Sequence, residues 1–142
     1  MKKTILSFGF FLLIGAAFAQ IENPVKWMYS AKKTGNKTYE LHMTANLDNK
    51  WHIYAQDAGE GPEPTSFSFS KNPLVKLDGK VAEIGKLEKT YDPNFKSTLK
   101  YYSTTVDFVQ KITLKSAATT VIKGTVSYMV CDDHKCLPPK EI

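Results

Sequence analysis

The chain has 142 residues, enough for one domain, and a formal net charge of +5 at pH 7. Its 19 basic residues are all lysines, and they are scattered along the chain. Nucleic-acid and phosphate sites favour arginine, whose guanidinium binds phosphate in a bidentate way. The composition therefore argues against a nucleic-acid partner, and we interpret the lysines as a solvated surface.

The N-terminus has the pattern of a secretory signal peptide. Two lysines precede an apolar run over residues 5–18, which leads into the cleavage sequence AFA. This run is too short for a normal transmembrane helix. We expect cleavage before Gln20, which removes residues 1–19 and leaves a single domain over 20–142. The AFA junction is typical of bacteria, so we expect this domain in the periplasm, without insertion into the membrane.

Short strands with turns between them follow in the mature chain. Residues 38–47 form the clearest strand, because apolar and polar residues alternate along it. His42 falls on its polar face, which predicts an ordinary surface histidine. A turn at 48–50 then leads into a returning strand that starts at 51–54.

The second half of the chain continues this pattern. An Asp-Gly pair at 78–79 signals a hairpin between short strands at 74–77 and 81–84. Two long β-prone runs follow, at 101–114 and 119–131. No segment has a convincing 3.6-residue apolar period. The sequence therefore predicts an all-β domain, a sandwich of two antiparallel sheets.

The two cysteines of the chain, Cys131 and Cys136, flank a short polar loop. A β-branched and aromatic run leads into the first, and two prolines follow the second. This pattern predicts a strand, a loop and the start of a second strand, with the cysteines opposite each other. Opposed residues in an antiparallel pair have Cα atoms about 4.5–5.5 Å apart, and a disulfide suits about 4.4–6.8 Å. The spacing is therefore compatible with an intrachain disulfide.

Three interpretations of the cysteine pair remain open from the residues alone. As a structural staple, a loop of about six residues would remove only roughly 2 kcal/mol of chain entropy. As a redox pair, the thiols would exchange with another protein. As a copper or zinc site, the cysteines and His134 would offer three ligands, without the CxxC spacing of structural zinc sites.

Three stretches resemble the amino-terminal periplasmic domain of the thiol:disulfide interchange protein DsbD. They are WHIY at 51–54, GPEPTSF at 61–67 and CDDHKCLPP at 131–139. The resemblance covers essentially the whole mature chain, and the last stretch is the most specific. It implies an immunoglobulin-like β-sandwich without an organic cofactor or metal. It also implies a cysteine pair that takes electrons from a membrane-embedded thiol donor and passes them to periplasmic thioredoxin-like proteins.

The resemblance also assigns roles to residues of this chain. Carried over by position, Cys131 and Cys136 are the redox pair, and Cys136 is the sulfur that bonds a partner. Tyr54 and His52 fall where the family has aromatic residues beside the cysteines. A cap loop that shields the pair matches residues 91–95.

Within that cap loop we expect Phe95 to be the shielding ring, with Tyr91 and Asp92 beside it.

In the loop between the cysteines, His134 is a candidate proton donor to a leaving thiolate. Lys135 should favour a thiolate at Cys136.

Two points separate this chain from the family. Some members have a slightly longer loop between the cysteines, and the parent protein continues into a membrane domain and a thioredoxin-like domain. The chain is either a stand-alone version or a piece of a longer redox protein. The rival hypotheses are an immunoglobulin-like binding module whose disulfide is structural, and a copper- or zinc-handling domain.

Overall fold

The computed structural model describes residues 22–93 and 95–142. The expected signal peptide, residues 1–19, and its cleavage site before Gln20 lie outside the described residues. Within the described residues, every regular element is a β-strand. The strands are β1 (Val25–Lys33), β2 (Thr38–Leu47), β3 (His52–Tyr54), β4 (Ser66–Phe69), β5 (Val75–Gly85), β6 (Glu88–Asp92), β7 (Ser97–Tyr102), β8 (Thr105–Leu114), β9 (Gly124–Tyr128), β10 (Val130–Cys131) and β11 (Lys140–Glu141).

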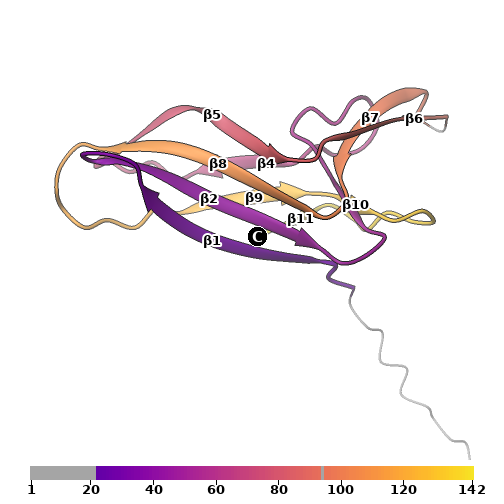
Figure 1. The fold of residues 1–142 in the computed structure, drawn as a ribbon, viewed down its shortest axis with the longest axis horizontal. Coiled ribbons are helices and arrows are strands. Elements are labelled where there is room, and N and C mark those ends of the chain that lie inside the picture. Colours follow the sequence, from indigo (N-terminus) through magenta and orange to yellow (C-terminus); the bar gives the residue numbers. More distant parts are fainter. Residues whose placement is uncertain (1–21, 94) are drawn as a thin grey trace, which may run out of the picture.

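The strands form three sheets, and every pairing is antiparallel. The long sheet has the order β1-β2-β8-β5, the end sheet β10-β3-β7-β6, and the short sheet β11-β9-β4. The molecule is elongated, and β6, β7 and β10 of the end sheet lie together at one end, on the right of Figure 1. The expected all-β fold is confirmed.

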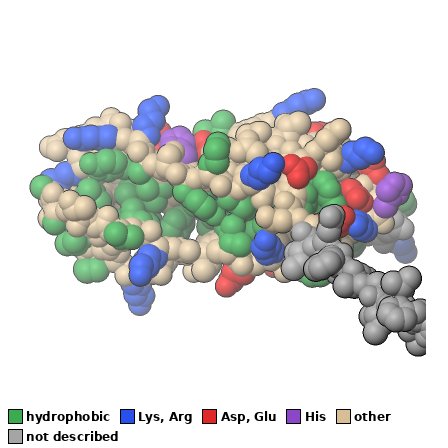
Figure 2. All heavy atoms as spheres, turned by 90° about the horizontal axis from the view of Figure 1, so that it is seen from below, with side chains coloured by type: hydrophobic (Ala, Val, Ile, Leu, Met, Phe, Trp, Pro, Cys, Tyr) green, Lys and Arg blue, Asp and Glu red, His purple; other side chains and the backbone are tan. Residues whose placement is uncertain are grey.

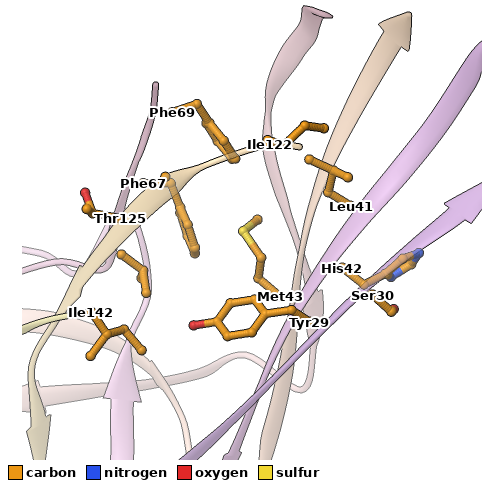
Figure 3. Close-up of a pocket in the computed structure, with 12 residues that line it drawn as sticks. Tyr29, Ser30, Leu41, His42, Met43, Phe67, Phe69, Ile122, Thr125 and Ile142 are labelled. Atoms are coloured by element: carbon orange, nitrogen blue, oxygen red, sulfur yellow. The ribbon is translucent and has the colours of Figure 1, made fainter. Parts of the chain in front are cut away.

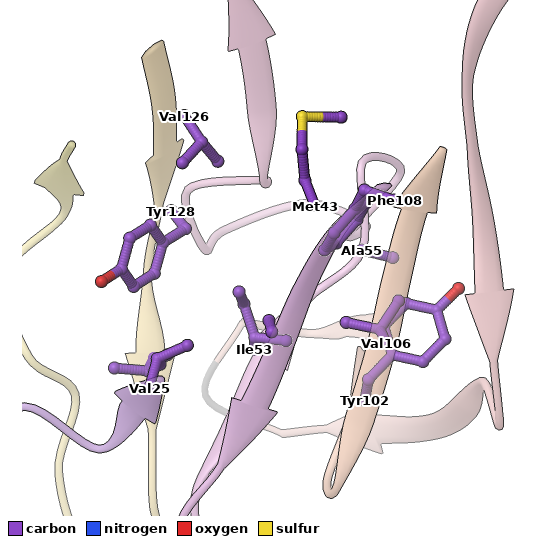
Figure 4. Packing of buried hydrophobic residues seen from close by; sticks show 11 residues of the cluster. Val25, Met43, Ile53, Ala55, Tyr102, Val106, Phe108, Val126 and Tyr128 are labelled. Atoms are coloured by element: carbon purple, nitrogen blue, oxygen red, sulfur yellow. The ribbon is translucent and has the colours of Figure 1, made fainter. Parts of the chain in front are cut away.

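Apolar side chains from all three sheets meet in one core (Figure 4). Phe108 of β8 is fully buried, and its ring centroid lies 6.0, 4.9 and 6.5 Å from those of three other aromatic residues. These are Trp27 of β1, Phe67 of β4 and Tyr102 of β7. One ring of the long sheet therefore joins it to both other sheets, and the burial of apolar surface holds the layers together.

The core is open on one side, between β1 and β2 of the long sheet and β4 and β9 of the short sheet. An apolar cleft of about 540 Å³ lies there. Tyr29, Met43 and Phe67 point into it in Figure 3, and Tyr29 is 61% exposed as a consequence. The face drawn in Figure 2 has hydrophobic side chains gathered in one half and lysines scattered around them, as expected for a solvated basic surface.

The expected Asp-Gly hairpin is wrong. Val75–Gly85 is a single strand, β5, which pairs with β8 on both sides of a register shift that follows Asp78. Gly79 takes a positive φ of 76° there, so the Asp-Gly pair forms a β-bulge instead of a turn. The buried side-chain amide of Gln110 donates to the carbonyl oxygens of Asp78 and Gly79, which satisfies this irregular backbone.

Two expectations about the path of the chain are also wrong. The strand after Trp51 does not return along β2, because β1 and β8 occupy both edges of β2. Instead, β3 crosses into the end sheet, where it pairs with β10 and β7. The run at 119–131 is not one strand either, since β9 begins at Gly124 and Met129 separates it from β10. The crossing of β3 is what brings residues 52–54 beside the cysteines.

His42 is not an ordinary surface histidine. Its side chain is 22% exposed, and its Nδ1 lies 2.7 Å from Asp107 Oδ2. Thr44 Oγ1 donates to the other oxygen of the same carboxylate at 3.0 Å. The β2–β8 register places Asp107 opposite Thr44, and alternation within one strand does not reveal that pairing.

Candidate functional site at the cysteine pair

The cysteines are joined across the end of β10. Cys131 and Cys136 form a disulfide and an isolated antiparallel bridge, with Cα atoms 4.0 Å apart. The predicted strand and loop are therefore present, with the cysteines opposite each other. Cys136 lies in this isolated bridge and not in a second strand, and the two Cα atoms are closer than the expected lower bound of about 4.4 Å. Asp132 shapes the loop, because its Oδ1 accepts the backbone N–H groups of His134 and Lys135, both at 2.8 Å. These hydrogen bonds lower the pKa of the Asp132 carboxyl.

The two sulfurs have different surroundings. Cys131 is 2% exposed and packs in a small apolar cluster with Tyr54, Ala58 and Leu99. Cys136 is exposed. Both line a cleft of about 390 Å³ at the end of the molecule. A molecule that enters this cleft therefore has better access to Cys136, which is exposed, than to Cys131, which is buried.

Tyr54 contacts the buried sulfur directly. Its hydroxyl donates a hydrogen bond to Cys131 Sγ at 3.2 Å. Its backbone is fixed by Thr65, whose buried hydroxyl donates to the Tyr54 carbonyl oxygen at 2.6 Å. Burial raises the pKa of Tyr54, and the charges of Asp92 and Tyr101 raise it further. The phenol therefore keeps its proton and can donate it in a hydrogen bond to sulfur.

His52 lies beside Tyr54 and lines the same cleft. Its Nε2 is 3.4 Å from the Tyr54 hydroxyl, and its ring lies edge-on to the Tyr54 ring with centroids 5.3 Å apart. On its other side it packs on Tyr101, with centroids 4.5 Å apart. Burial lowers the pKa of His52. Three nearby carboxylates raise it to a smaller extent, those of Asp133, Glu88 and Asp132.

The predicted cap loop borders the same cleft. Phe95 and Asp92 line it, and the Phe95 backbone N–H donates to Asp92 Oδ1 at 3.2 Å. The Phe95 ring rests on Gly61, where a Cβ atom would lie 2.1 Å from the ring. Gly61 has a φ of 123°, so both its conformation and its missing side chain suit this contact. Tyr91 is 62% exposed and does not line the cleft.

Lys135 lines the same cleft as Cys136 and also forms an ion pair. Its ammonium is paired with Glu22 Oε2 at 2.6 Å and lies 5.9 Å from the centroid of the Trp51 ring. Glu22 raises the pKa of Lys135 through this hydrogen bond. The carboxylate of Glu22 therefore lies beside the ammonium that the sequence suggested would favour a thiolate at Cys136. His134 is exposed and lines the cleft.

Sequence reasoning missed three residues of the cleft. Thr90, Leu99 and Tyr101 line it from β6 and β7, and the Thr90 and Tyr101 hydroxyls are 3.0 Å apart. Tyr101 was visible only as part of a long β-prone run. Its place opposite Tyr54 depends on the β3–β7 register, for which one sequence carries no signal.

Two further observations bear on other kinds of site. In the described part of the chain, no three His, Cys, Asp or Glu side chains are grouped so that they would hold a metal ion. No helix long and apolar enough to cross a bilayer occurs between residues 22 and 142, residue 94 aside.

The fold and the site define a small all-β domain with a disulfide at one end, in a cleft that is also lined by aromatic side chains. The family model of the N-terminal domain of the thiol:disulfide interchange protein DsbD matches residues 19–142. The chain belongs to this family. The expected immunoglobulin-like sandwich is confirmed by the fold of its solved neighbours.

Two solved structures are similar in fold. The N-terminal periplasmic domain of ScsB from Proteus mirabilis is 12% identical, with a TM-score of 0.60, and the match covers 84% of this chain and 45% of that one. The Neisseria meningitidis DsbD N-terminal domain in the reduced form is 13% identical, with a TM-score of 0.52 and coverage of 81% and 79%. This chain thus spans less than half of the ScsB structure. No curated protein matches the sequence.

Proposed function

We propose that this domain exchanges thiols and disulfides with thioredoxin-like proteins through Cys131 and Cys136. The observation that carries the proposal is the asymmetry of the pair. One sulfur is exposed in a cleft, and the other is buried and hydrogen-bonded to a phenol. Thiol–disulfide exchange passes through a mixed disulfide and needs one accessible sulfur, while the second sulfur resolves that intermediate.

The exchange with an oxidised partner has two steps. The Cys136 thiolate attacks one sulfur of the partner's disulfide, so a mixed disulfide forms and the partner's other sulfur leaves as a thiolate. Cys131 then loses its proton and attacks Cys136 Sγ, which closes the Cys131–Cys136 bond and releases the partner's second thiolate. The partner has gained two electrons and this domain has lost two. A membrane-embedded thiol donor would restore the reduced pair.

The surroundings of the pair support selective access. Phe95 and Asp92 border the cleft from the cap loop, and a movement of this loop would widen the approach to Cys136. The site has no helix N-terminus beside either cysteine within the described residues, so we expect an ordinary thiol whose partner choice depends on docking and on the cap.

We also propose that the mature domain, residues 20–142, acts in the periplasm after removal of residues 1–19. The N-terminal sequence pattern supports this, and the similar ScsB domain is described as periplasmic. A persistent disulfide also suits that compartment.

A trapping experiment tests the proposed exchange. In Cys131→Ser the free Cys136 should form a covalent, reductant-sensitive adduct with a periplasmic thioredoxin-like protein, because the resolving sulfur is missing. In the matched variant Cys136→Ser the free thiol is buried, so we expect much less adduct. Absence of an adduct from Cys131→Ser with every thioredoxin-like protein offered would contradict the proposal and favour a structural disulfide.

A further inference from the structure

Three side chains form a line of polar contacts that ends at the buried sulfur. His52 Nε2 lies 3.4 Å from Tyr54 Oη, and Tyr54 Oη lies 3.2 Å from Cys131 Sγ. The Tyr54 proton points to sulfur in this arrangement, so the Tyr54 oxygen accepts from His52 Nε2–H. The line is therefore continuous, from imidazole N–H through phenol O–H to sulfur.

The fold fixes this line. His52 stands opposite Cys131 in the β3–β10 pairing, and Tyr54 stands opposite Tyr101 in the β3–β7 pairing. The His52 ring is held between the rings of Tyr54 and Tyr101. Among the described residues, Tyr54 Oη donates the hydrogen bond to Cys131 Sγ, so the phenol offers a route for a proton to that sulfur.

We propose that His52 is a positioning residue for the exchange, one that exchanges protons with Cys131 through the Tyr54 hydroxyl. The inference rests on the proposed function and adds a proton route for the sulfur of Cys131, a residue that is 2% exposed. It assigns to His52 the role that the sequence suggested for His134. His134 is exposed, and its recorded hydrogen bond is the one from its backbone to Asp132.

The proton follows the electrons in each direction. When a thiolate attacks Cys136, the new sulfur–sulfur bond forms, the Cys131–Cys136 bond breaks, and its electron pair goes to Cys131 Sγ. That sulfur takes the proton of Tyr54, which takes a proton from the His52 imidazolium. In the reverse direction, neutral His52 accepts a proton from Tyr54 as Tyr54 takes one from the Cys131 thiol. The resulting Cys131 thiolate attacks Cys136 Sγ of the mixed disulfide, so the Cys131–Cys136 bond forms, the bond to the attacking reagent breaks, and that reagent's sulfur leaves as a thiolate.

Several charged groups face this line from the neighbouring elements. Asp132 and Asp133 of the inter-cysteine loop and Glu88 of β6 favour the imidazolium, and burial opposes it. Asp92 of β6 and Tyr101 of β7 act on Tyr54. Burial is the larger influence on His52, so the imidazolium should form below its ordinary pKa of 6.5.

The test follows the reduction of the Cys131–Cys136 disulfide by dithiothreitol from about pH 5 to about pH 8, with each rate divided by the reagent's thiolate concentration. In the wild-type protein this corrected rate should rise on the acid side, with an inflection below pH 6.5. We expect a rise of roughly threefold to tenfold, less than for a direct acid catalyst because the imidazole acts through the phenol. A flat wild-type profile would overturn the proposal without reference to any variant.

Matched variants identify the residue whose titration causes the inflection in the pH profile. His52→Phe keeps an aromatic ring between Tyr54 and Tyr101, and it should remove the inflection. His134→Gln should retain it. Tyr54→Phe should slow reduction at every pH by about tenfold, because a hydrogen bond to the developing thiolate is lost. The double variant His52→Phe/Tyr54→Phe should then match Tyr54→Phe alone.

Two outcomes of these comparisons would contradict the role of His52. One is an inflection that survives in His52→Phe and disappears in His134→Gln. The other is a further loss from His52→Phe when Tyr54 is already replaced. The reagent is a small dithiol, so this test does not depend on a protein partner. If Cys131→Ser traps an adduct but the dithiothreitol rate has a flat pH profile, the proton route alone is refuted. If the profile has the inflection but no adduct forms, the proposed function alone is refuted.

Discussion

The proposed aromatic cover of the cysteine cleft can be tested at single residues. Phe95 is 39% exposed and rests on Gly61 at the border of the cleft. Replacement by alanine removes a partly buried ring worth about 1 kcal/mol to the closed loop. We therefore predict that Phe95→Ala speeds the alkylation of the reduced cysteines roughly fivefold. Tyr91→Ala, outside the cleft, is the control, and equal alkylation rates in wild type and Phe95→Ala would remove the assigned shielding role.

Gly61 offers a second test at the residue scale. A Cβ there would lie 2.1 Å from the Phe95 ring, so Gly61→Ala must displace the ring as well as strain the backbone at a φ of 123°. We predict a loss of about 1–3 kcal/mol in the free energy of unfolding, together with faster alkylation. Gly79→Ala is the matched control, because Gly79 also has a positive φ but a Cβ added to it would have nothing within 4 Å. Faster alkylation in both variants would show that strain alone, not the ring, is responsible.

At the scale of elements, one carboxylate accepts two hydrogen bonds within the inter-cysteine loop, in addition to the backbone hydrogen bond from Asp132 N–H to the Lys135 carbonyl oxygen. Asp132 accepts two backbone N–H groups, from His134 and Lys135. In Asp132→Ala the exchange of these two amide hydrogens with solvent should become faster, whereas Asp132→Asn keeps an acceptor oxygen and should preserve most of the protection. Unchanged protection in Asp132→Ala, measured by NMR, would show that the loop does not depend on this side chain.

The same carboxylate gives the loop a pH dependence with a defined sign. The pKa of Asp132 is lower in the folded protein than its ordinary value of 3.8. The stabilisation of the loop by the ionised Asp132 carboxylate is therefore complete above pH 3.8, and it is lost as the pH falls through the folded-state pKa. Protection of the two amides, corrected for intrinsic exchange, should decrease over that acid range in wild type and stay constant in Asp132→Ala.

The elements also show how far one sequence determines this fold. Alternation located the strand at 38–47 and the opposition of the cysteines, because both are local. The Asp-Gly pair at 78–79 was misread because a bulge and a hairpin use the same positive-φ glycine, and the choice depends on pairing with β8. The crossing of β3 into the end sheet likewise depends on pairing with β7 and β10, which are distant in the sequence.

For the site, the sequence supplied the cysteines, and the family resemblance supplied the residues beside them. Neither of them predicts the contacts between segments that are distant in the sequence. The Tyr54–Cys131 hydrogen bond spans 77 positions, and the ion pair that occupies Lys135 joins the loop to Glu22. The first depends on the pairing of β3 with β10, and the second on where the segment before β1 lies. The proton route through His52 is therefore a property of the folded sheet.

At the scale of the whole molecule, Phe108 joins the three sheets. Its buried ring lies among Trp27, Phe67 and Tyr102, so Phe108→Ala leaves a cavity at their junction. We predict a loss of about 3–5 kcal/mol in the free energy of unfolding, measured by urea denaturation. Val121→Ala, at a residue that is 72% exposed, should change it by less than about 0.5 kcal/mol. A small effect of Phe108→Ala would mean that the sheets are held together elsewhere.

The reduction potential of the Cys131–Cys136 pair tests the central proposal most directly. It is obtained by equilibrating the protein in glutathione or dithiothreitol redox buffers and counting free thiols. A pair that exchanges with thioredoxin-like proteins should titrate at roughly −180 to −270 mV. A potential below about −300 mV would identify a permanently closed structural bond and contradict the proposed function.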